Sequence, residues 1–443
     1  MASSVSCLTA RPASTHPFDT EGIPIMTATG EASTLEPEVV QEEVIGGVDT
    51  HADTIHVALV SVLGRDLVDQ EFATTPAGYA DALDFLGSHG EIRRVGIEGT
   101  SSYGIGLTRA VRTAGLEVTE VNRPDRAERR RIGKSDPIDA YQAAHAVLSG
   151  RATSAPKTEQ IDALRALHVA RRSAVKARTA AMNQIHQLLV TAPAAIREKY
   201  RALKEDALVS ALARCRPTTG TSGDLSSRMV LTALKAIAQR HDYLGAQADA
   251  LRREITVLVH AANPGLLATH GVGPDTAAQL LITAGGNPER LTSEASFAAL
   301  CGTAPVPASS GKITRHRLAR GGDRAANSAL HTIALVRMSS GHPPTKAFVA
   351  RHRDPAHGKQ RSSKEILRML KRAIAREIFK HLTRPVAVPA IDDLRETRRA
   401  KNITTTRAAQ QFGVWPATIS KIELGVRRDD TFANRYREWL LIA

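Results

Sequence analysis

The sequence predicts an α/β layer domain that is followed by a mainly α-helical region. Residues 43–150 alternate between short β-branched apolar runs and stretches in which apolar residues have helical spacing. Beyond residue 157, the apolar residues recur at helical spacing over much longer stretches. We therefore expect a mixed sheet with helices packed against it in the N-terminal part of the chain, and helices in most of the remainder.

The predicted elements of residues 43–150 follow a definite order. Three strands come first, and helices and strands alternate after them, which is typical of a mixed sheet. The predicted strands are 44–49, 55–61, 67–73, 93–98 and 116–121. The predicted helices are 76–88, 103–114 and 137–149.

The composition is that of a soluble globular protein. Hydrophobic residues make up 42% and charged residues 23% of the 443 positions, and no apolar run reaches the roughly 20 residues of a membrane span. Residues 1–25 lack the basic start and the compact apolar core of a signal peptide. The three cysteines, Cys7, Cys215 and Cys301, are too scattered to indicate disulfides or a zinc cluster. We therefore expect a cytoplasmic protein that has no membrane partner.

Positive charge is concentrated in the last third of the chain. Residues 301–443 contain 28 Lys and Arg against 11 Asp and Glu, whereas the net charge of the whole chain is +14. A basic region on an otherwise near-neutral chain is typical of nucleic-acid binding, although the aromatic content of 4% argues against base stacking as the main binding mode. Residues 1–42 are acidic and lack periodicity, so we expect a disordered tail. Met26 within this tail is an alternative start.

Two of the predicted strands end in a carboxylate. Asp49 closes an apolar run that contains Gly46 and Gly47, and such small residues allow another backbone or a ligand to approach closely. Glu98 closes a second apolar run and is also followed by small residues. Taken alone, Asp49 is also explained as the first residue of a hairpin turn, where aspartate is common.

A second pair of carboxylates opens a predicted helix. Asp136 precedes Pro137, and Asp139 lies three residues later in the positive first turn. By itself, Asp136 is explained as a helix N-cap. All four carboxylates can nevertheless converge at one sheet edge, where they would repel one another unless a cation lies among them. Because Mg²⁺ prefers oxygen ligands and works in pairs in nucleases, the candidate ligands of two Mg²⁺ ions are Asp49, Glu98, Asp136 and Asp139.

The stretch just before this helix is strongly basic. Its side chains could hold phosphate groups beside metal ions bound by the carboxylates. The candidate phosphate contacts are Arg129, Arg130, Arg131 and Lys134.

Residues 157–262 are predicted to form a helical hairpin or an intermolecular coiled coil, with a break at 217–224. The basic residues between its apolar positions are explained either as a solvated face or as nucleic-acid contacts. The next segment, residues 263–383, begins with a Gly271-Val-Gly273 turn that resembles a helix-hairpin-helix. Backbone N–H groups of such a turn can bind phosphate at a helix start.

Two hydroxyls in this segment lie beside a dense basic run. Ser309 and Ser310 follow two prolines, and Gly311 frees the backbone behind them. One explanation is an ordinary loop that grips phosphate with its cations. The sharper hypothesis is a serine nucleophile whose neighbours stabilise a pentavalent phosphate. The candidate phosphate contacts are Lys312, Arg315, Arg317, Arg320 and Arg324.

Taken together, these motifs resemble the IS110/IS1111 (IS116/IS902) family of transposases. The likeness consists of carboxylates in the order D…E…D-x-x-D, then Gly-Val-Gly-Pro, Pro-Val-Pro-Ala-Ser-Ser-Gly-Lys, Arg-Gly-Gly-Asp-Arg and Asn-x-Ala-Leu-His, over about residues 44–380. The resemblance implies that residues 43–150 form a RuvC-like, RNase H-type domain whose acidic tetrad binds Mg²⁺. It also implies that residues 263–383 form a transposase domain with a serine that joins covalently to DNA.

The resemblance further implies a recombinase that moves its own insertion element. A structured non-coding RNA would guide it, and it would work as a dimer or tetramer. We favour Ser309 as the nucleophile. Ser310 stays open because the family often has one more Gly before the Lys. Two other functions remain: a junction-resolving nuclease would use the carboxylates without the serine, and a non-catalytic DNA-binding regulator would use only the basic helices.

Residues 384–391 are predicted to be a linker and residues 392–443 a separate DNA-binding module. The module resembles a Cro/repressor-type helix-turn-helix, with Gly413 at the turn and 415–424 as the recognition helix. An ordinary two-helix end of a bundle is the alternative. The residues expected to face the major groove are Trp415, Thr418 and Lys421.

Overall fold

The computed structural model describes residues 42–121, 135–217, 225–285, 291–309, 316–317, 319, 321–358, 360–385, 388, 391–425 and 429–443. The predicted disordered tail falls almost wholly on residues 1–41, which lie outside these ranges. Among the described helices, none has both the length and the apolar character that a membrane crossing requires.

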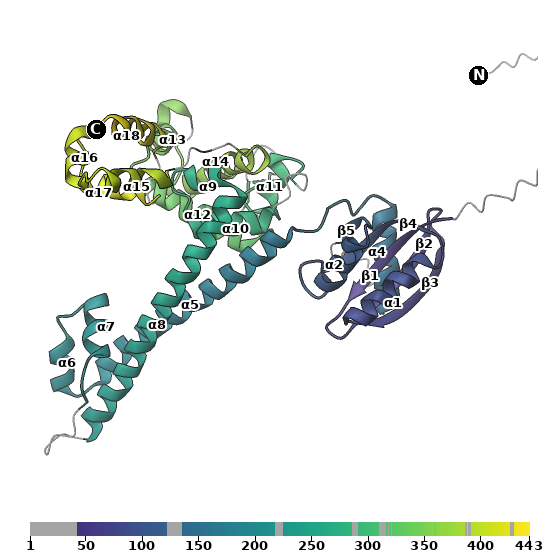
Figure 1. Ribbon diagram of the computed structural model, residues 1–443, viewed down its shortest axis with the longest axis horizontal. Coiled ribbons are helices and arrows are strands. Elements are labelled where there is room, and N and C mark those ends of the chain that lie inside the picture. The colour runs from purple at the N-terminus through teal and green to yellow at the C-terminus, as the bar shows by residue number, and fades with distance from the viewer. Residues whose placement is uncertain are drawn as a thin grey trace, which may run out of the picture. The chain divides into compact units, whose positions relative to one another are not determined.

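A five-stranded mixed sheet forms the centre of the N-terminal domain (Figure 1). Its strands are β1 (Glu43–Thr50), β2 (Thr54–Ser61), β3 (Asp66–Ala73), β4 (Glu91–Glu98) and β5 (Val118–Val121). They lie in the order β3-β2-β1-β4-β5. The β1–β2 and β2–β3 pairs are antiparallel, whereas the β1–β4 and β4–β5 pairs are parallel. The predicted mixed sheet is confirmed, and the parallel pairing brings the carboxyl ends of β1 and β4 to one edge.

Helices cover both faces of this sheet (Figure 1). One face packs against α1 (Pro76–Gly87) and α2 (Ile105–Thr113), and the other packs against α4 (Asp136–Leu148). The alternation of side chains along β1 separates the two cores, because Val44 and Val48 join the first core and Ile45 joins the second.

Two glycines allow α4 to lie directly on the sheet. A β-carbon at Gly47 would come within 2.2 Å of the Ala140 carbonyl oxygen and 2.4 Å of the Ala144 backbone nitrogen. A β-carbon at Gly96 would come within 2.5 Å of the Val147 side chain. Because no larger residue fits at Gly47, the prediction of a close backbone approach there is confirmed. The first turn of α4 is thereby held near the end of β1.

A pair of long helices follows the sheet domain. The helices of this part are α5 (Glu159–Thr191), α6 (Ala194–Tyr200), α7 (Glu205–Ala213) and α8 (Leu225–Ala262). Arg178 of α5 bonds His241 of α8 at 3.2 Å, and Gln184 accepts from Arg240 at 2.6 Å. Residue numbers fall along α8 as they rise along α5, so the two helices form an antiparallel hairpin (Figure 1).

The next part packs its helices around α10. Its elements are α9 (Pro264–Ala268), α10 (Pro274–Ala284), α11 (Glu294–Leu300), β6 (Val306–Pro307), β7 (His316–Arg317), α12 (Arg324–Ser339), α13 (Pro343–Arg353) and α14 (Ser363–Thr383). Every residue of α10 from Ala277 to Ala284 is buried. A helix that is buried on all sides lies in the middle of a core. The surrounding core includes residues of α5, α8, α12 and α14.

The C-terminal helices have a core of their own. They are α15 (Asp392–Ala400), α16 (Thr405–Phe412), α17 (Pro416–Glu423) and α18 (Asp430–Ile442). Arg398 donates to both carboxylate oxygens of Glu423, at 2.6 and 3.0 Å, and the Tyr436 hydroxyl donates to the same group at 2.8 Å. A buried ion pair needs such additional bonds to offset desolvation. Gly413, with φ of 61°, lies between α16 and α17, at the predicted turn.

Candidate functional site

The end of β1 places Asp49 at the carboxyl edge of the sheet. Only 6% of this residue is exposed, and the Thr50 backbone N–H donates to Asp49 Oδ1 at 2.9 Å. The Thr50 hydroxyl donates to the Glu98 carbonyl at 2.9 Å, which ties the ends of β1 and β4 together. Because Val48 pairs in register with Ile97, Glu98 follows directly beside Asp49 on the neighbouring strand.

The first turn of α4 contributes two further carboxylates. Asp139 is buried, whereas the Asp136 side chain is 39% exposed. The prediction that Asp136 caps the helix is wrong, because the N-cap is Ser135 and Asp136 is the first helical residue. Ser135 has the extended backbone of an N-cap, and Pro137 fits the first turn that follows. The Asp136 carboxylate therefore does not have the role of a helix cap, and it contacts another side chain instead.

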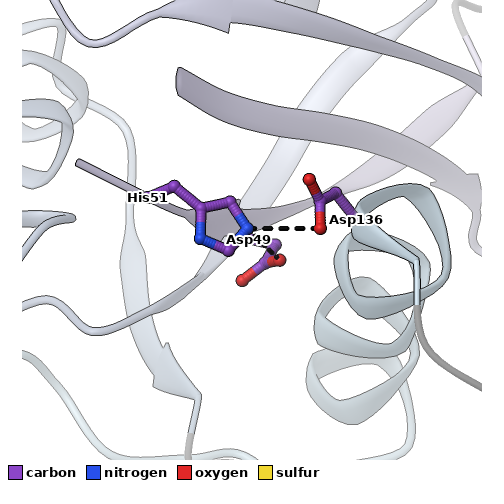
Figure 2. Close-up of side chains that lie close together, drawn as sticks. All are labelled: Asp49, His51 and Asp136. Carbon is purple, nitrogen blue, oxygen red and sulfur yellow. Dashed lines mark ion pairs between the residues drawn. The ribbon is translucent and has the colours of Figure 1, made fainter. Parts of the chain in front are cut away.

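That side chain is His51, which lies between two of the carboxylates (Figure 2). His51 Nε2 is 3.3 Å from Asp49 Oδ2 and 3.2 Å from Asp136 Oδ1. Ligand atoms of these three residues all lie within 4.8 Å of one another. His51 is not among the ligands predicted from the sequence. The signal was the Asp-x-His spacing at a strand end, because residues two apart on a strand face the same side.

The electrostatics of Asp49 reflect this crowding. Burial raises the pKa of the Asp49 carboxyl above its ordinary value. His51 opposes this increase, the Asp139 carboxylate adds to it, the Thr50 N–H opposes it, and Asp136 adds to it. The cluster is therefore a place where negative charge is unfavourable without a cation.

The donor groups suit a divalent cation. Asp49 Oδ2 is buried and accepts no hydrogen bond among the described residues, although His51 Nε2 lies 3.3 Å away. Carboxylate oxygens are preferred by Mg²⁺ and Mn²⁺, and an imidazole nitrogen suits the transition metals. Asp49, His51 and Asp136 thus form a candidate divalent metal site. The Asp139 carboxylate is near enough to raise the pKa of Asp49.

Several predicted site residues cannot be placed. The candidates outside the described residues are Arg129, Arg130, Arg131, Lys134, Ser310, Lys312, Arg315 and Arg320.

Residues 303–321, which we call the serine arm, join α11 to α12. The arm contains the short β6–β7 ladder, in which Val306 pairs with Arg317. Ser309 is exposed and follows β6 by two residues. Arg317 on the arm and Arg324 at the start of α12 are also exposed. The ladder therefore sets one predicted hydroxyl and one predicted cation on the two sides of a single hairpin-like arm.

The predicted phosphate-binding turn lies between α9 and α10. Gly271 has φ of 81°, a conformation that favours glycine. The Gly273 N–H donates to the Thr276 hydroxyl at 3.0 Å, and the Val272 N–H donates to the Thr269 carbonyl at 3.1 Å. Two of the three backbone N–H groups in the turn are thus already bonded within the protein. Fewer N–H groups are therefore available to a phosphate than the sequence pattern indicates.

The predicted base contacts of the C-terminal module lie at the start and along one side of α17. Trp415 is its N-cap and is 80% exposed. Thr418 is half-buried and Lys421 is exposed. Their sequence neighbours Ile419 and Ile422 are buried, so the polar positions face away from the core of the module.

Two family models match the chain. A model described as a transposase, and named for the IS110 group and its DEDD residues, matches residues 46–192. A model described as Transposase IS116/IS110/IS902 family matches residues 265–350. Together they span more than half of the chain, and they include the carboxylate cluster and the serine arm. No curated protein matches the chain.

Proposed function

The chain belongs to the IS116/IS110/IS902 family of transposases, and on this basis we propose that it is the recombinase of an insertion sequence. It cuts and rejoins DNA with a metal-binding carboxylate cluster and a serine nucleophile. The observation that carries the proposal is the gathering of Asp49, His51 and Asp136 ligand atoms within 4.8 Å. A mixed α/β domain with such a cluster at a strand end is compatible with a RuvC-like, RNase H-type nuclease.

The carboxylates hold the cation in this proposal. Asp49, Asp136 and Asp139 are its proposed ligands. Glu98, which follows beside Asp49 on the adjacent strand, is the fourth candidate. The proposed cofactor is Mg²⁺, as two ions, because the group is dominated by oxygen donors. Bound Mg²⁺ would polarise a DNA phosphate and lower the pKa of an oxygen nucleophile.

The serine arm supplies the nucleophile. The Ser309 hydroxyl oxygen forms a bond to a DNA phosphorus as the bond from that phosphorus to a deoxyribose oxygen breaks. The proton lost by the serine balances the proton that the leaving oxygen takes up to become a deoxyribose hydroxyl. Ser310 is the second candidate. Neither serine has an acid or a histidine next to it in the sequence. Activation therefore requires the arm to meet a carboxylate cluster, in the same subunit or in another subunit of a dimer or tetramer.

The partners follow from the same proposal. The DNA consists of the element ends and the target, and a structured RNA from the element guides the choice of target. Exposed Arg317 and Arg324 beside the arm are placed to contact phosphates.

The C-terminal module is proposed to be a helix-turn-helix that reads DNA with Trp415, Thr418 and Lys421. Removal of residues 386–443 is expected to flatten the salt dependence of DNA binding. The log–log slope should change by about one for each lost phosphate contact. Recombination should persist at low salt. A folded but inactive truncated protein at every salt concentration would assign a catalytic or assembly role to the module.

Denaturing electrophoresis after reaction with labelled DNA and Mg²⁺ tests the central proposal. The wild type and Ser310→Ala are expected to form a covalent protein–DNA adduct, whereas Ser309→Ala is not. Cleavage without any adduct would support a junction-resolving nuclease. DNA binding with neither cleavage nor adduct would support a non-catalytic regulator.

A further inference from the structure

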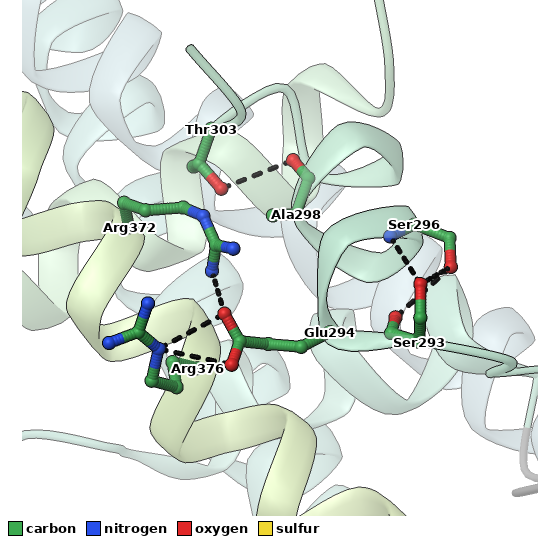
Figure 3. A network of polar contacts seen from close by, with 7 residues as sticks. All are labelled: Ser293, Glu294, Ser296, Ala298, Thr303, Arg372 and Arg376. Carbon is green, nitrogen blue, oxygen red and sulfur yellow. Dashed lines mark hydrogen bonds and ion pairs between the residues drawn. The ribbon is translucent and has the colours of Figure 1, made fainter.

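The serine arm begins directly after a hydrogen-bonded C-terminal cap of α11. Gly302 has φ of 62°, and the Thr303 backbone N–H donates to the Ala298 carbonyl at 2.8 Å. The Thr303 hydroxyl donates to the same carbonyl at 3.2 Å (Figure 3). This is the pattern in which a glycine ends a helix and turns the chain away from it. The first residue of the arm is therefore fixed against the last turn of α11.

The C-terminal end of the serine arm returns to the end of α11. The Asp323 backbone N–H donates to the Leu300 carbonyl at 2.6 Å. A β-carbon at Gly322, whose φ is 87°, would come within 2.6 Å of that same carbonyl oxygen. The Asp323 carboxylate caps α12 and also accepts from the Thr283 hydroxyl at 2.6 Å. Both ends of the arm are thus held at the C-terminus of α11.

A single side chain, Asn327 of α12, binds the backbone at this point. Its Nδ2 group donates to the carbonyls of Cys301 and Gly302, both at 2.9 Å. Its Oδ1 atom accepts from Lys371 Nζ of α14. Because an ammonium group can only donate, Lys371 fixes the Oδ1 end of the amide and leaves Nδ2 for the two carbonyls.

Burial of the Lys371 ammonium group at this position is energetically unfavourable. Lys371 is 9% exposed and has no acidic partner among the described residues. Burial, together with the nearby Arg368, lowers the pKa of Lys371. Burying an unpaired cation is unfavourable, and an apolar side chain would fill the same space at less cost. An apolar residue, however, has no charged donor. The charged Lys371 donor polarises the Asn327 amide and thereby strengthens the bonds from its Nδ2 group to the two carbonyls.

The same helix holds the other end of α11 in a different way. Arg372 and Arg376 of α14 both contact Glu294 in the first turn of α11 (Figure 3). The Arg376 side chain is 59% exposed, and an exposed ion pair contributes little to stability. One helix therefore carries a buried cation at the arm end of α11, and a half-buried and an exposed cation at the opposite end.

We propose that Lys371 is a positioning residue that holds the serine arm through Asn327. The inference rests on the proposed function for what the arm does with DNA. The contacts that carry it are those of Lys371, Asn327, Cys301 and Gly302, which we call the arm clamp.

The first test measures adduct formation in one turnover by the full-length protein. The probe is a labelled duplex carrying the ends of the chain's own element, at saturating concentration, with Mg²⁺ and RNA transcribed from the element's flank. Lys371→Met is expected to slow adduct formation by about ten- to a hundredfold, as misplacement of a reacting group does. DNA affinity should stay within about twofold of the wild type, because the variant removes a buried group. Arg376→Met, which removes the same charge from the same helix, should leave both quantities unchanged.

The second test needs no reaction. Hydrogen exchange of the Gly302, Thr303 and Ala304 amides should be faster in Lys371→Met than in the wild type or in Arg376→Met. Unchanged exchange at these amides would overturn the inference, and so would an unchanged rate of adduct formation. If the wild type forms no adduct, the serine proposal fails separately, and the exchange measurement alone then decides whether Lys371 holds the arm.

Discussion

The carboxylate cluster at the end of β1 and the arm clamp at the end of α11 are both polar and partly buried, but they are built in opposite ways. In the cluster, Asp49 lies near two like charges, and one of its buried oxygens accepts no hydrogen bond among the described residues. In the clamp, Asn327 uses its Nδ2 donors on two carbonyls and its Oδ1 acceptor on Lys371. The cluster brings like charges together, whereas in the clamp both ends of the Asn327 amide are hydrogen-bonded within the protein.

This difference separates a site that binds from a site that positions. Unsatisfied buried charge is unfavourable for folding and is retained where function needs it. A satisfied network instead makes one backbone arrangement more rigid than its alternatives. Changes in the cluster should therefore affect catalysis with little loss of stability, and changes around the clamp should affect stability or arm geometry. The following predictions test that contrast, from the largest effect to the smallest.

Substitution in the cluster should abolish cleavage while leaving the fold intact. Asp49→Asn keeps the size of the side chain but removes a metal-binding charge. We expect Mg²⁺-dependent strand cleavage to fall by about a hundredfold or more, the several kcal/mol that a catalytic metal supplies. DNA binding should remain, as measured by fluorescence anisotropy.

The matched control is Asp53→Asn, which removes the same charge from an exposed position in the turn after β1. It should cleave normally. Near-normal cleavage by Asp49→Asn would remove the cluster from the mechanism, and a large loss of its thermal stability would contradict the contrast with the clamp.

Substitution next to the clamp should reverse this pattern. The Asp323 carboxylate accepts from the Ala325 and Ala326 N–H groups and from the Thr283 hydroxyl. Asp323→Ala should therefore lower the free energy of unfolding by about 2–3 kcal/mol, the loss of a helix cap and of a buried hydrogen bond. Calorimetry measures this change.

Asp354→Ala is the control, because Asp354 caps a short exposed turn through the Ala356 N–H. Its effect should stay below about 1 kcal/mol. Equal losses in the two variants would mean that the Asp323 contacts add nothing beyond an ordinary cap.

The reactivity of Cys301 tests how tightly the end of α11 is packed beside the arm clamp. Its thiol is fully buried at the end of α11, and burial raises the pKa of Cys301 to about 12. Because the thiolate is the reactive form, Cys301 should resist iodoacetamide at pH 8 in the folded protein. Mass spectrometry of alkylated peptides should find that Cys215, which is half-buried, is modified before Cys301. Rapid alkylation of Cys301 in the wild type would show that this region opens readily.

A paired carboxylate in the C-terminal module should show the ordinary acid response. Arg437 donates to both oxygens of Asp393, at 2.7 and 2.9 Å, and this bonding lowers the pKa of Asp393. A lowered folded pKa adds stability above the unfolded pKa of about 3.9, and that stability is lost as the pH falls through the folded value. The module should therefore lose stability below about pH 4, and Asp393→Asn should remove part of that loss.

Trp415 and Trp439 are the only tryptophans and both lie in the module, so their fluorescence in urea reports its unfolding alone. Glu438→Gln is the control, because Glu438 is exposed on the same helix as Arg437 and has no ion pair among the described residues. An identical pH response in the wild type and in Asp393→Asn would show that the pair contributes nothing measurable.

Much of the N-terminal fold could be predicted from local pattern. The five strands and three helices expected between 43 and 150 are present, with ends that differ by at most two residues. Short β-branched apolar runs and helical spacing of apolar residues were sufficient for this, because both depend on neighbours in the sequence. The same reasoning correctly identified Gly47 as a point of close approach but could not name α4 as the element that approaches.

The candidate site was only partly accessible to the same reasoning. The four carboxylates could be proposed because two of them end predicted strands and two open a predicted helix, and their order matches that of a known family. The assignment of Asp136 as a helix cap was wrong, because Ser135 one residue earlier has the required extended backbone. His51 was missed, although its Asp-x-His spacing from Asp49 at a strand end was a signal for it.

The sequence by itself determined the order of the elements, the concentration of positive charge near the C-terminus and the identity of the family. These properties depend on residue type and on spacing along the chain. Only the tertiary structure decided that His51 lies between two carboxylates and that Lys371 reaches Asn327 across 44 positions of sequence. Such contacts depend on how helices and strands pack against one another, because packing brings together side chains that no local pattern relates.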